Sequence, residues 1–98
     1  MPSYRVIMTI GPLRPGTAPH EVLPAAADAV AEVALLEASS VNVVRGAARI
    51  TVRFTVEDDE VAVQVGEHAV SVTEERAAVE DTRLTRQSRG RWTTVATR

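Results

Sequence analysis

The chain has 98 residues, no cysteine and a formal net charge of −2, and these features already exclude several classes of protein. Its length fits one domain with a single hydrophobic core, and its lack of cysteine excludes disulfides, thiolate metal sites and cysteine nucleophiles. The negative charge predicts no general affinity for nucleic acid, and no apolar run approaches the about 18 residues of a membrane-spanning helix. We therefore expect one cytoplasmic domain over residues 1–98, with no membrane segment and no signal peptide.

The first predicted elements are a strand, a rigid loop and a helix. Apolar and polar residues alternate over residues 4–10, which is typical of a strand. Ile7 interrupts the alternation, as expected of a central strand that is covered at least partly on both faces. Residues 11–19 are rich in proline and glycine and predict a loop, in which Thr17 is a candidate N-cap. An apolar stripe of alanine, valine and leucine then predicts a helix over residues 20–34.

A β-hairpin is predicted in the middle of the chain. Residues 35–44 lead from the helix into a second strand that is rich in valine, and residues 48–56 alternate cleanly as a third strand. Residues 45–48 lie between the two, with Gly46 available for a turn that needs a positive φ. The third strand is the most regular stretch of the sequence, so we expect it at the centre of the fold.

The second half of the chain predicts a helix and two further strands. Four carboxylates over residues 57–60 favour a helix N-terminus. Val61, Val63 and Val65 alternate as in a strand, but residues 61–75 are too many for one strand, and their apolar stripe favours a helix. Residues 77–87 form a weak, polar strand that fits a sheet edge. A turn over residues 88–91 is followed by a short final strand over residues 92–95.

The order of these elements is β-α-β-β-α-β, followed by a short β extension over residues 88–98. This order resembles the ferredoxin-like fold, and the resemblance covers residues 4–87. It implies an α+β domain in which two interleaved βαβ units form a four-stranded antiparallel sheet with both helices on one face. It also implies that the first and third strands are central and that the second and fourth are edges.

With both helices on one face, the other face of the sheet is left for solvent or a partner. Many proteins of this fold pair through the sheet as homodimers, and the small apolar side chains of this chain favour a homo-oligomer. The C-terminal Trp92 is expected to lie over the sheet end or in a dimer contact. Six residues are the predicted interface: Arg5, Ile7, Thr51, Arg53, Thr55 and Trp92.

Two observations argue against nucleic acid as a partner. RNA recognition on such a sheet needs exposed aromatic residues on the central strands, whereas Tyr4 and Phe54 share the parity of the core. The C-terminal segment has arginines around Trp92 that suit weak, non-specific binding, but exposed arginine on an edge strand also prevents aggregation. The arginines of this segment are Arg83, Arg86, Arg89, Arg91 and Arg98.

The loop before the first helix is the candidate ligand site. A helix N-terminus can hold an anion on its free amides, with Arg14, Thr17 and His20 beside it. The acylphosphatases, which share this fold, hold phosphate in this loop with an arginine and an asparagine. Arg14 and Asn42 are candidates for those two roles, although the loop lacks the Gly-x-Val-Gln-Gly pattern of that family.

Two further families of this fold suggest other sites. Regulatory domains of the ACT type bind amino acids near a glycine of the same loop, a role for which Gly11 or Gly16 is available. The dimeric α+β barrel enzymes need an acid, base or positioning group between sheet and helices, and His68 on the second helix is the candidate. His20 and His68 have no metal-ligand spacing, so we expect neither a metal nor a cofactor.

The sequence ranks three functions without identifying one. The first is a non-enzymatic, homodimeric interaction domain that acts on a protein partner through its open sheet face or its C-terminal hairpin. The alternative is a small-ligand or anion-binding domain, or a cofactor-free enzyme, with a pocket near the loop over residues 11–20 or near His68. The third is a weak nucleic-acid binder that depends on its C-terminal arginines. We expect no catalytic residues.

Overall fold

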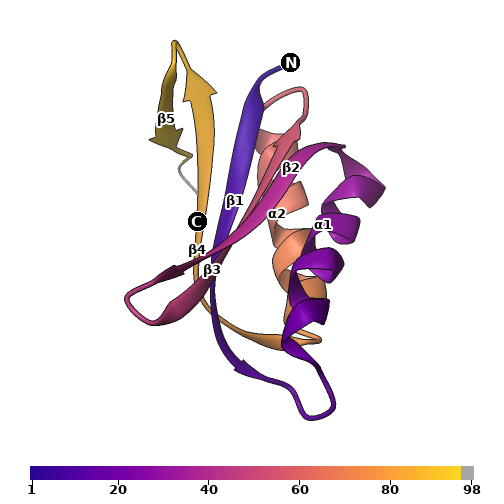
Figure 1. Ribbon diagram of the computed structural model, residues 1–98. Helices are drawn as coiled ribbons and strands as arrows, with labels where there is room; N and C mark the ends of the chain where they lie inside the picture. The colour runs from indigo at the N-terminus through magenta and orange to yellow at the C-terminus, as the bar shows by residue number, and fades with distance from the viewer. Residues whose placement is uncertain (96–98) are drawn as a thin grey trace.

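The computed structural model describes residues 1–95 and has the α+β architecture that the sequence predicts. Two helices cover one face of a five-stranded antiparallel sheet, whose strands lie in the order β2-β3-β1-β4-β5 (Figure 1). Neither of these helices lies on the other face of the sheet, and residues 1–95 place no further helix there. The elements are β1 (Ser3–Leu13), the short 3-10 helix η1 (Pro19–Glu21), α1 (Val22–Val33), β2 (Leu35–Val44), β3 (Ala47–Thr55), α2 (Asp59–Thr73), β4 (Ala77–Ser88) and β5 (Arg91–Thr94).

The sheet has five strands instead of the predicted four, because the C-terminal segment joins it. The turn at Arg89 and Gly90, both at positive φ, folds β5 back so that Arg91 lies opposite Ser88 and Trp92 opposite Gln87. The fourth strand was predicted at the edge, and this is wrong for the end of β4 that β5 covers. The two outermost strands are β2 and β5.

The core lies between the sheet and the helices and follows from the alternation in β1 and β3. Tyr4 lies opposite Phe54 and Val6 opposite Val52, and all four side chains are fully buried. The rings of Tyr4 and Phe54 stack on each other, with their centroids 5.8 Å apart. The helices contribute small residues such as Ala26 to this core. One parity of each central strand is therefore committed to the helices, and the other parity faces outward.

Local hydrogen bonds fix where each helix starts. The start of the second helix agrees with the prediction, and the N-cap of the first differs from it. Asp58 accepts a hydrogen bond from the Val61 amide at 3.0 Å and is the N-cap of α2, inside the predicted acidic start. The predicted N-cap Thr17 is wrong. The chain enters η1 at Ala18, whose amide donates to the Glu21 carboxylate at 3.0 Å. The prolines of the loop delay regular helix to Val22.

The hairpin of β2 and β3 has a shorter turn than predicted. Arg45 and Gly46 both have positive φ and form a two-residue turn, so β3 begins at Ala47. A bulge between Leu36 and Ala38 interrupts the pairing near the start of β2. The hairpin crosses the sheet and its tip bends away from the helices, so Arg45 and Gly46 are exposed (Figure 1).

Candidate interaction surface

The open face of the sheet contains every residue that the sequence predicted for an interface. Strand pairing places Arg5 opposite Arg53 and Thr85, and Ile7 opposite Thr51 and Arg83. Trp92 joins this face from β5, because it lies opposite Gln87 and shares the parity of Thr85. These side chains are mostly half-buried or exposed, so they are available to a partner.

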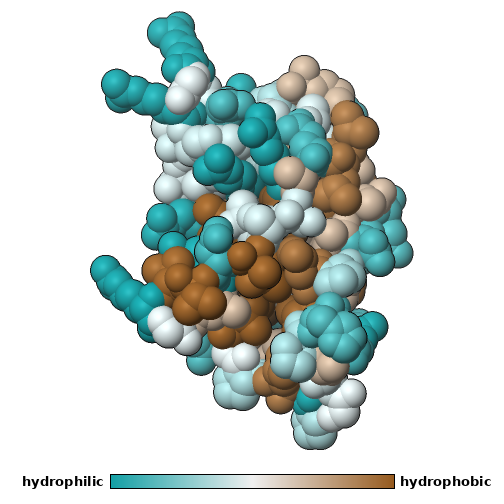
Figure 2. Space-filling model, viewed as in Figure 1, coloured by the Kyte–Doolittle hydropathy of each residue, from teal (hydrophilic) through white to brown (hydrophobic). Residues whose placement is uncertain are grey.

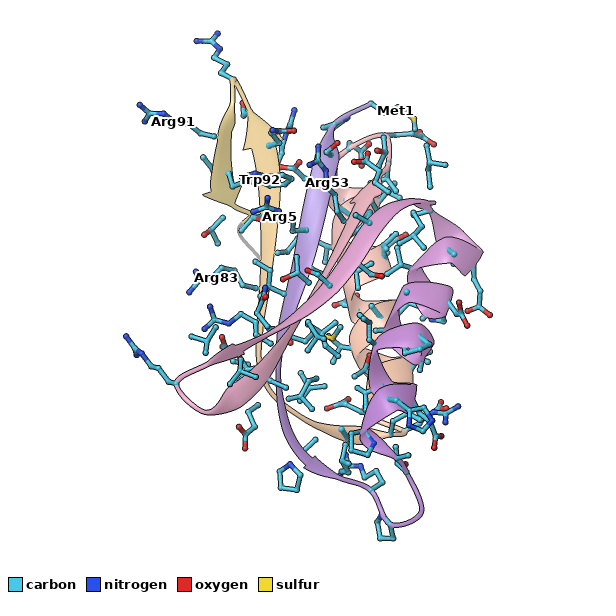
Figure 3. All side chains as sticks on the ribbon, in the orientation of Figure 1. Met1, Arg5, Arg53, Arg83, Arg91 and Trp92 are labelled. Carbon is cyan, nitrogen blue, oxygen red and sulfur yellow. The ribbon has the colours of Figure 1, made fainter. Side chains whose placement is uncertain are left out.

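At the centre of this surface, Trp92 contacts two guanidinium groups. The Cζ atom of Arg5 lies 3.8 Å from the centroid of the Trp92 ring, and that of Arg53 lies 5.2 Å away (Figure 3). Both distances are within the range of cation–π attraction. The arginine side chains and the indole therefore hold one another in place on the sheet. We call Arg5, Arg53 and Trp92 the Arg–Trp cluster.

Neighbouring strands fix the Arg–Trp cluster. The Nε atom of Arg53 donates to the Glu37 carboxylate at 2.7 Å, and its Nη2 donates to Gln87 at 3.3 Å. Ser3 donates to the same carboxylate at 3.0 Å. Each of the five strands thus contributes at least one side chain, and Arg53 has lost conformational freedom before any partner binds. Arg5 has neither a hydrogen bond nor an ion pair from its side chain within residues 1–95.

The charge of the chain is divided between the two sides of the sheet. Arg76 pairs with Glu21 at 2.7 Å and Arg86 with Asp59 at 3.0 Å, so these basic groups are neutralised on the helix side. The open face instead combines four arginines with Asp81 and with Glu37 at its border. A chain of net charge −2 therefore presents a basic face. The arginines of that face are Arg5, Arg49, Arg53 and Arg83.

A shallow polar hollow adjoins the Arg–Trp cluster. It has a volume of about 350 Å³, and Arg5, Arg53 and Thr51 form one side of it while β2 forms the other. Its remaining lining includes Ser40, whose side chain lies on the open face opposite Thr51. Hydroxyl and guanidinium donors around one depression suit the oxygen atoms of a carboxylate.

The predicted ligand residues of the first loop do not form one site. Arg14 donates its Nε to the carbonyl oxygen of Glu74 at 2.9 Å, and it thereby satisfies the C-terminal end of α2 instead of facing a cavity. Thr17 lies in the turn, where its amide donates to the Arg14 carbonyl at 3.1 Å. His20 lies in η1 and is exposed. The structure therefore does not bring these three groups together around one point.

His68 was considered as a group in a pocket between sheet and helices, and it lies elsewhere. Its Nε2 is 3.0 Å from the Oε1 of Glu32, so it links the two helices at the surface of the helix layer. Its side chain is 39% exposed. His68 lines neither the hollow beside the Arg–Trp cluster, nor the groove beside the first loop, nor the cavity between α2 and the adjacent strands.

An apolar groove does lie beside the first loop. Its volume is about 760 Å³, and it separates the tip of the β2–β3 hairpin from the start of α1. Ile10, Leu23 and Val41 line it, with His20 and Glu80 as its titratable groups. Figure 2 shows apolar side chains gathered beside the hairpin. The sequence pointed to an anion at this loop, whereas the groove that is present is lined mainly by hydrocarbon.

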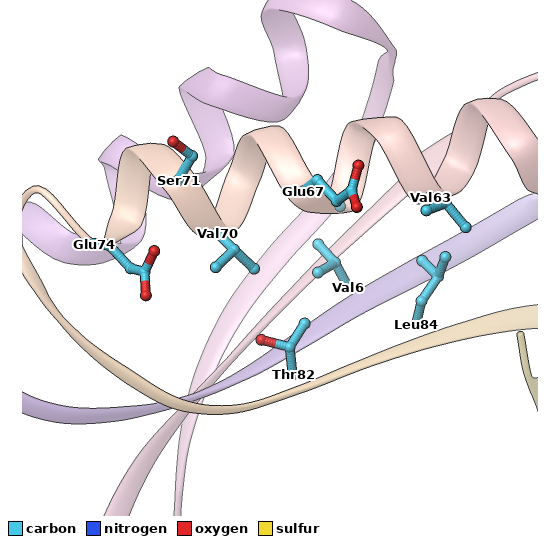
Figure 4. A pocket seen from close by; sticks show the side chains of 9 residues that line it. Val6, Val63, Glu67, Val70, Ser71, Glu74, Thr82 and Leu84 are labelled. Atoms are coloured by element: carbon cyan, nitrogen blue, oxygen red, sulfur yellow. The ribbon is translucent and has the colours of Figure 1, made fainter. Parts of the chain in front are cut away.

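A second cavity of about 340 Å³ opens between α2 and the adjacent strands. Val6, Val70 and Leu84 form its apolar part, and the carboxylates of Glu67 in α2 and of Glu74 directly after α2 lie beside it (Figure 4). No histidine lines it. Within residues 1–95, no group of three histidine or acidic side chains is placed to hold a metal ion.

The described part of the chain thus forms a two-layer α+β protein with a basic, open sheet face. Comparison with known proteins identifies no relative, since no family model, curated protein or solved structure matches the chain. None of the helices in residues 1–95 has both the length and the apolar character needed to cross a membrane. The function is therefore argued from the surface itself.

Proposed function

We propose that this chain is a non-enzymatic, cytoplasmic protein-interaction domain of the ferredoxin-like class, extended by a fifth strand. Its open sheet face binds an acidic segment of a protein partner. The observation behind this proposal is the Arg–Trp cluster, in which one indole lies against the guanidinium groups of Arg5 and Arg53. The absence of cysteine supports the cytoplasmic location.

The chemistry of the cluster fits carboxylates. A guanidinium that contacts an aromatic ring through its face keeps its N–H groups available around its edge for bidentate bonds to a carboxylate. Arg5 has all of its side-chain donors free of hydrogen bonds within the described chain, whereas Arg53 gives one donor to Glu37 and another to Gln87. The hollow beside them provides hydroxyl groups from Ser40 and Thr51, which lie opposite each other on the open face. An acidic side chain can therefore bind there without displacing any ion pair.

Binding of an acidic peptide at Arg5 can be followed by the fluorescence of Trp92, the only tryptophan of the chain. Titration with an oligoglutamate peptide should change the fluorescence of Trp92, and added salt should weaken the binding. Arg5→Gln should weaken it about threefold to tenfold, which corresponds to roughly 1 kcal/mol for one charge-assisted contact. Calorimetry of the same titration gives the dissociation constant independently of the fluorescence.

The matched control is Arg91→Gln. This substitution also removes one arginine charge, from the strand that contains Trp92, but Arg91 has the opposite parity to Trp92 and points away from the cluster (Figure 3). Its affinity for the peptide should stay within about twofold of the wild type. Equal losses in both variants, or no binding by the wild type, would refute the proposal. Tighter binding of a mixed-sequence single-stranded DNA than of the peptide would favour the nucleic-acid function instead.

The groove supports a second candidate function, the binding of an apolar small molecule. Its volume of about 760 Å³ is in the range of about 300 to 1,000 Å³ found for small-molecule sites, and Ile10, Leu23 and Val41 supply an apolar lining. A panel of fatty acids of increasing chain length should raise the melting temperature of the wild type. Leu23→Asp should abolish that increase, because it places a charge beside the bound chain. An unchanged melting temperature across the panel would exclude this function.

A further inference from the structure

The two edges of the sheet are protected to very different degrees. β5 has only four residues, and the turn before it contains Arg89. Short edge strands and charged side chains are two ways in which natural sheets prevent edge pairing. β2 has ten residues, pairs only with β3, and contains one charged residue and no proline. That residue, Glu37, is bonded to Arg53 and Ser3. The outer side of β2 is therefore an unguarded row of backbone donors and acceptors.

β2 also exposes hydrocarbon along this edge. Leu35 is 63% exposed, Val41 50% and Val43 75%. Val41 and Val43 share the parity of the helix face, yet the helices do not cover them. Apolar β-branched residues on an unpaired edge strand are typical of a strand that pairs with another chain.

We propose that this edge pairs with β2 of a second copy of the chain, antiparallel and about a two-fold axis at Val41. A two-fold axis perpendicular to the sheet keeps the two faces of the sheet apart, so residues that lie opposite each other across the axis must belong to the same face. With Val41 on the axis, each residue of β2 lies opposite a residue of the same parity, and the requirement is met. It places Val41 opposite Val41 of the second copy, and Ser40 opposite Asn42. The two five-stranded sheets then form one continuous sheet, with the helices of both copies on the same side.

The charges at the two ends of the strand favour the antiparallel pairing of identical copies. Glu37 lies near the start of β2, and Arg45 lies in the turn directly after it. Antiparallel copies bring the bulge that contains Glu37 in one chain beside the turn that contains Arg45 in the other, twice per dimer, so Arg45 adds a positive charge near a carboxylate that Arg53 and Ser3 already contact. Arg45 is exposed and has no ion pair among residues 1–95. Opposite charges across a strand pair stabilise it, whereas a parallel arrangement would place like charges together.

This placement differs from pairing through the open face, which the sequence analysis considered. Two copies packed face to face would oppose the arginines of that face, which is unfavourable between like charges. Edge pairing leaves the Arg–Trp cluster uncovered. The inference therefore does not depend on the proposed function, and each can fail without the other.

Disulfide cross-linking tests the register, because the native chain has no cysteine. In Val41→Cys the two new thiols lie on the axis, with Cα atoms about 4.5 to 5.5 Å apart, which a disulfide can span. Mild oxidation should convert most of this variant to a covalent dimer. In the control Val43→Cys the two thiols are four residues apart along the pair, at roughly 13 Å, and should stay reduced. Equal cross-linking of both variants would overturn the register.

Light scattering tests the dimer without any cross-link. The wild type should have twice the mass of the chain, and Val41→Lys should be a monomer, because it places a positive charge opposite its own copy. The control Thr94→Lys adds the same charge to the other edge strand and should remain dimeric. A monomeric wild type, or a Val41→Lys dimer, would overturn the proposal.

Discussion

Replacing Phe54 with alanine is expected to lower the free energy of unfolding by about 3 to 5 kcal/mol. Phe54 is fully buried in β3, and its ring stacks on Tyr4 with the centroids 5.8 Å apart. The substitution removes a large apolar surface and leaves a cavity between the sheet and the helices. A domain of this size has only about 5 to 15 kcal/mol of stability, so the variant should lose a large part of it.

Urea unfolding followed by circular dichroism measures this change, and Trp92→Ala is the matched control. Trp92 is a larger aromatic residue in the same sheet, but it lies half-buried on the open face and contacts Arg5 and Arg53. Its removal should lower the stability by less than about 2 kcal/mol, since little enclosed space is left behind. A Trp92→Ala variant that is as unstable as Phe54→Ala would contradict the assignment of the core to the helix side.

The α+β arrangement was predictable because the relevant signals are local. Alternation in β1 and β3 places Tyr4 and Phe54 in the core, and the acidic run before α2 indicates its start. The same alternation assigns Arg5 and Arg53 to the open face without any knowledge of their partners. Period and capping are properties of a few consecutive residues, so they can be interpreted before the fold is known.

The Arg–Trp cluster was predicted only as separate residues. Its three members come from β1, β3 and β5, and the register that brings them together is a long-range property. One usable signal was present, since Arg89-Gly90 repeats the Arg45-Gly46 pair of the other hairpin. That repeat indicates a second two-residue turn, which would have placed Trp92 opposite Gln87.

The ligand residues failed to converge for a similar reason. Arg14 was assigned to an anion because it precedes a helix, but it donates to the carbonyl of Glu74 at the end of the other helix. An arginine beside one helix N-terminus cannot be distinguished by sequence from one that satisfies a distant C-terminus. Arg98, which was grouped with the C-terminal arginines, lies outside the described residues.

Stability should fall steeply between pH 10 and 12 because of Tyr4. Burial, and after it the hydrogen bond to Asp59 at 2.6 Å, together raise the pKa of this phenol to about 12. The pKa in the folded state is thus above the value of about 10 in the unfolded chain. The stabilisation is fully present below pH 10 and is lost as the pH rises through 12. A difference of about two pKa units corresponds to roughly 2 to 3 kcal/mol.

The composition of the chain allows the ionisation of Tyr4 to be measured without overlap from other side chains. There is no lysine or cysteine, and Tyr4 is the only tyrosine, so no other side chain titrates between pH 10 and 12. Absorbance at about 295 nm follows the phenolate directly, and urea unfolding at each pH gives the stability. The folded protein should ionise about two pH units above the protein in urea.

Tyr4→Phe is the control, because it keeps the ring in the core and removes the titrating hydroxyl. Arg86 still donates to the Asp59 carboxylate at 3.0 Å in that variant, so Asp59 keeps a partner. Its stability should be nearly constant from pH 10 to 12, while that of the wild type declines. Parallel declines in the two proteins would show that the alkaline loss has another origin. A wild-type phenol that titrates near pH 10 in the folded state would show that its burial against Asp59 is not maintained in solution.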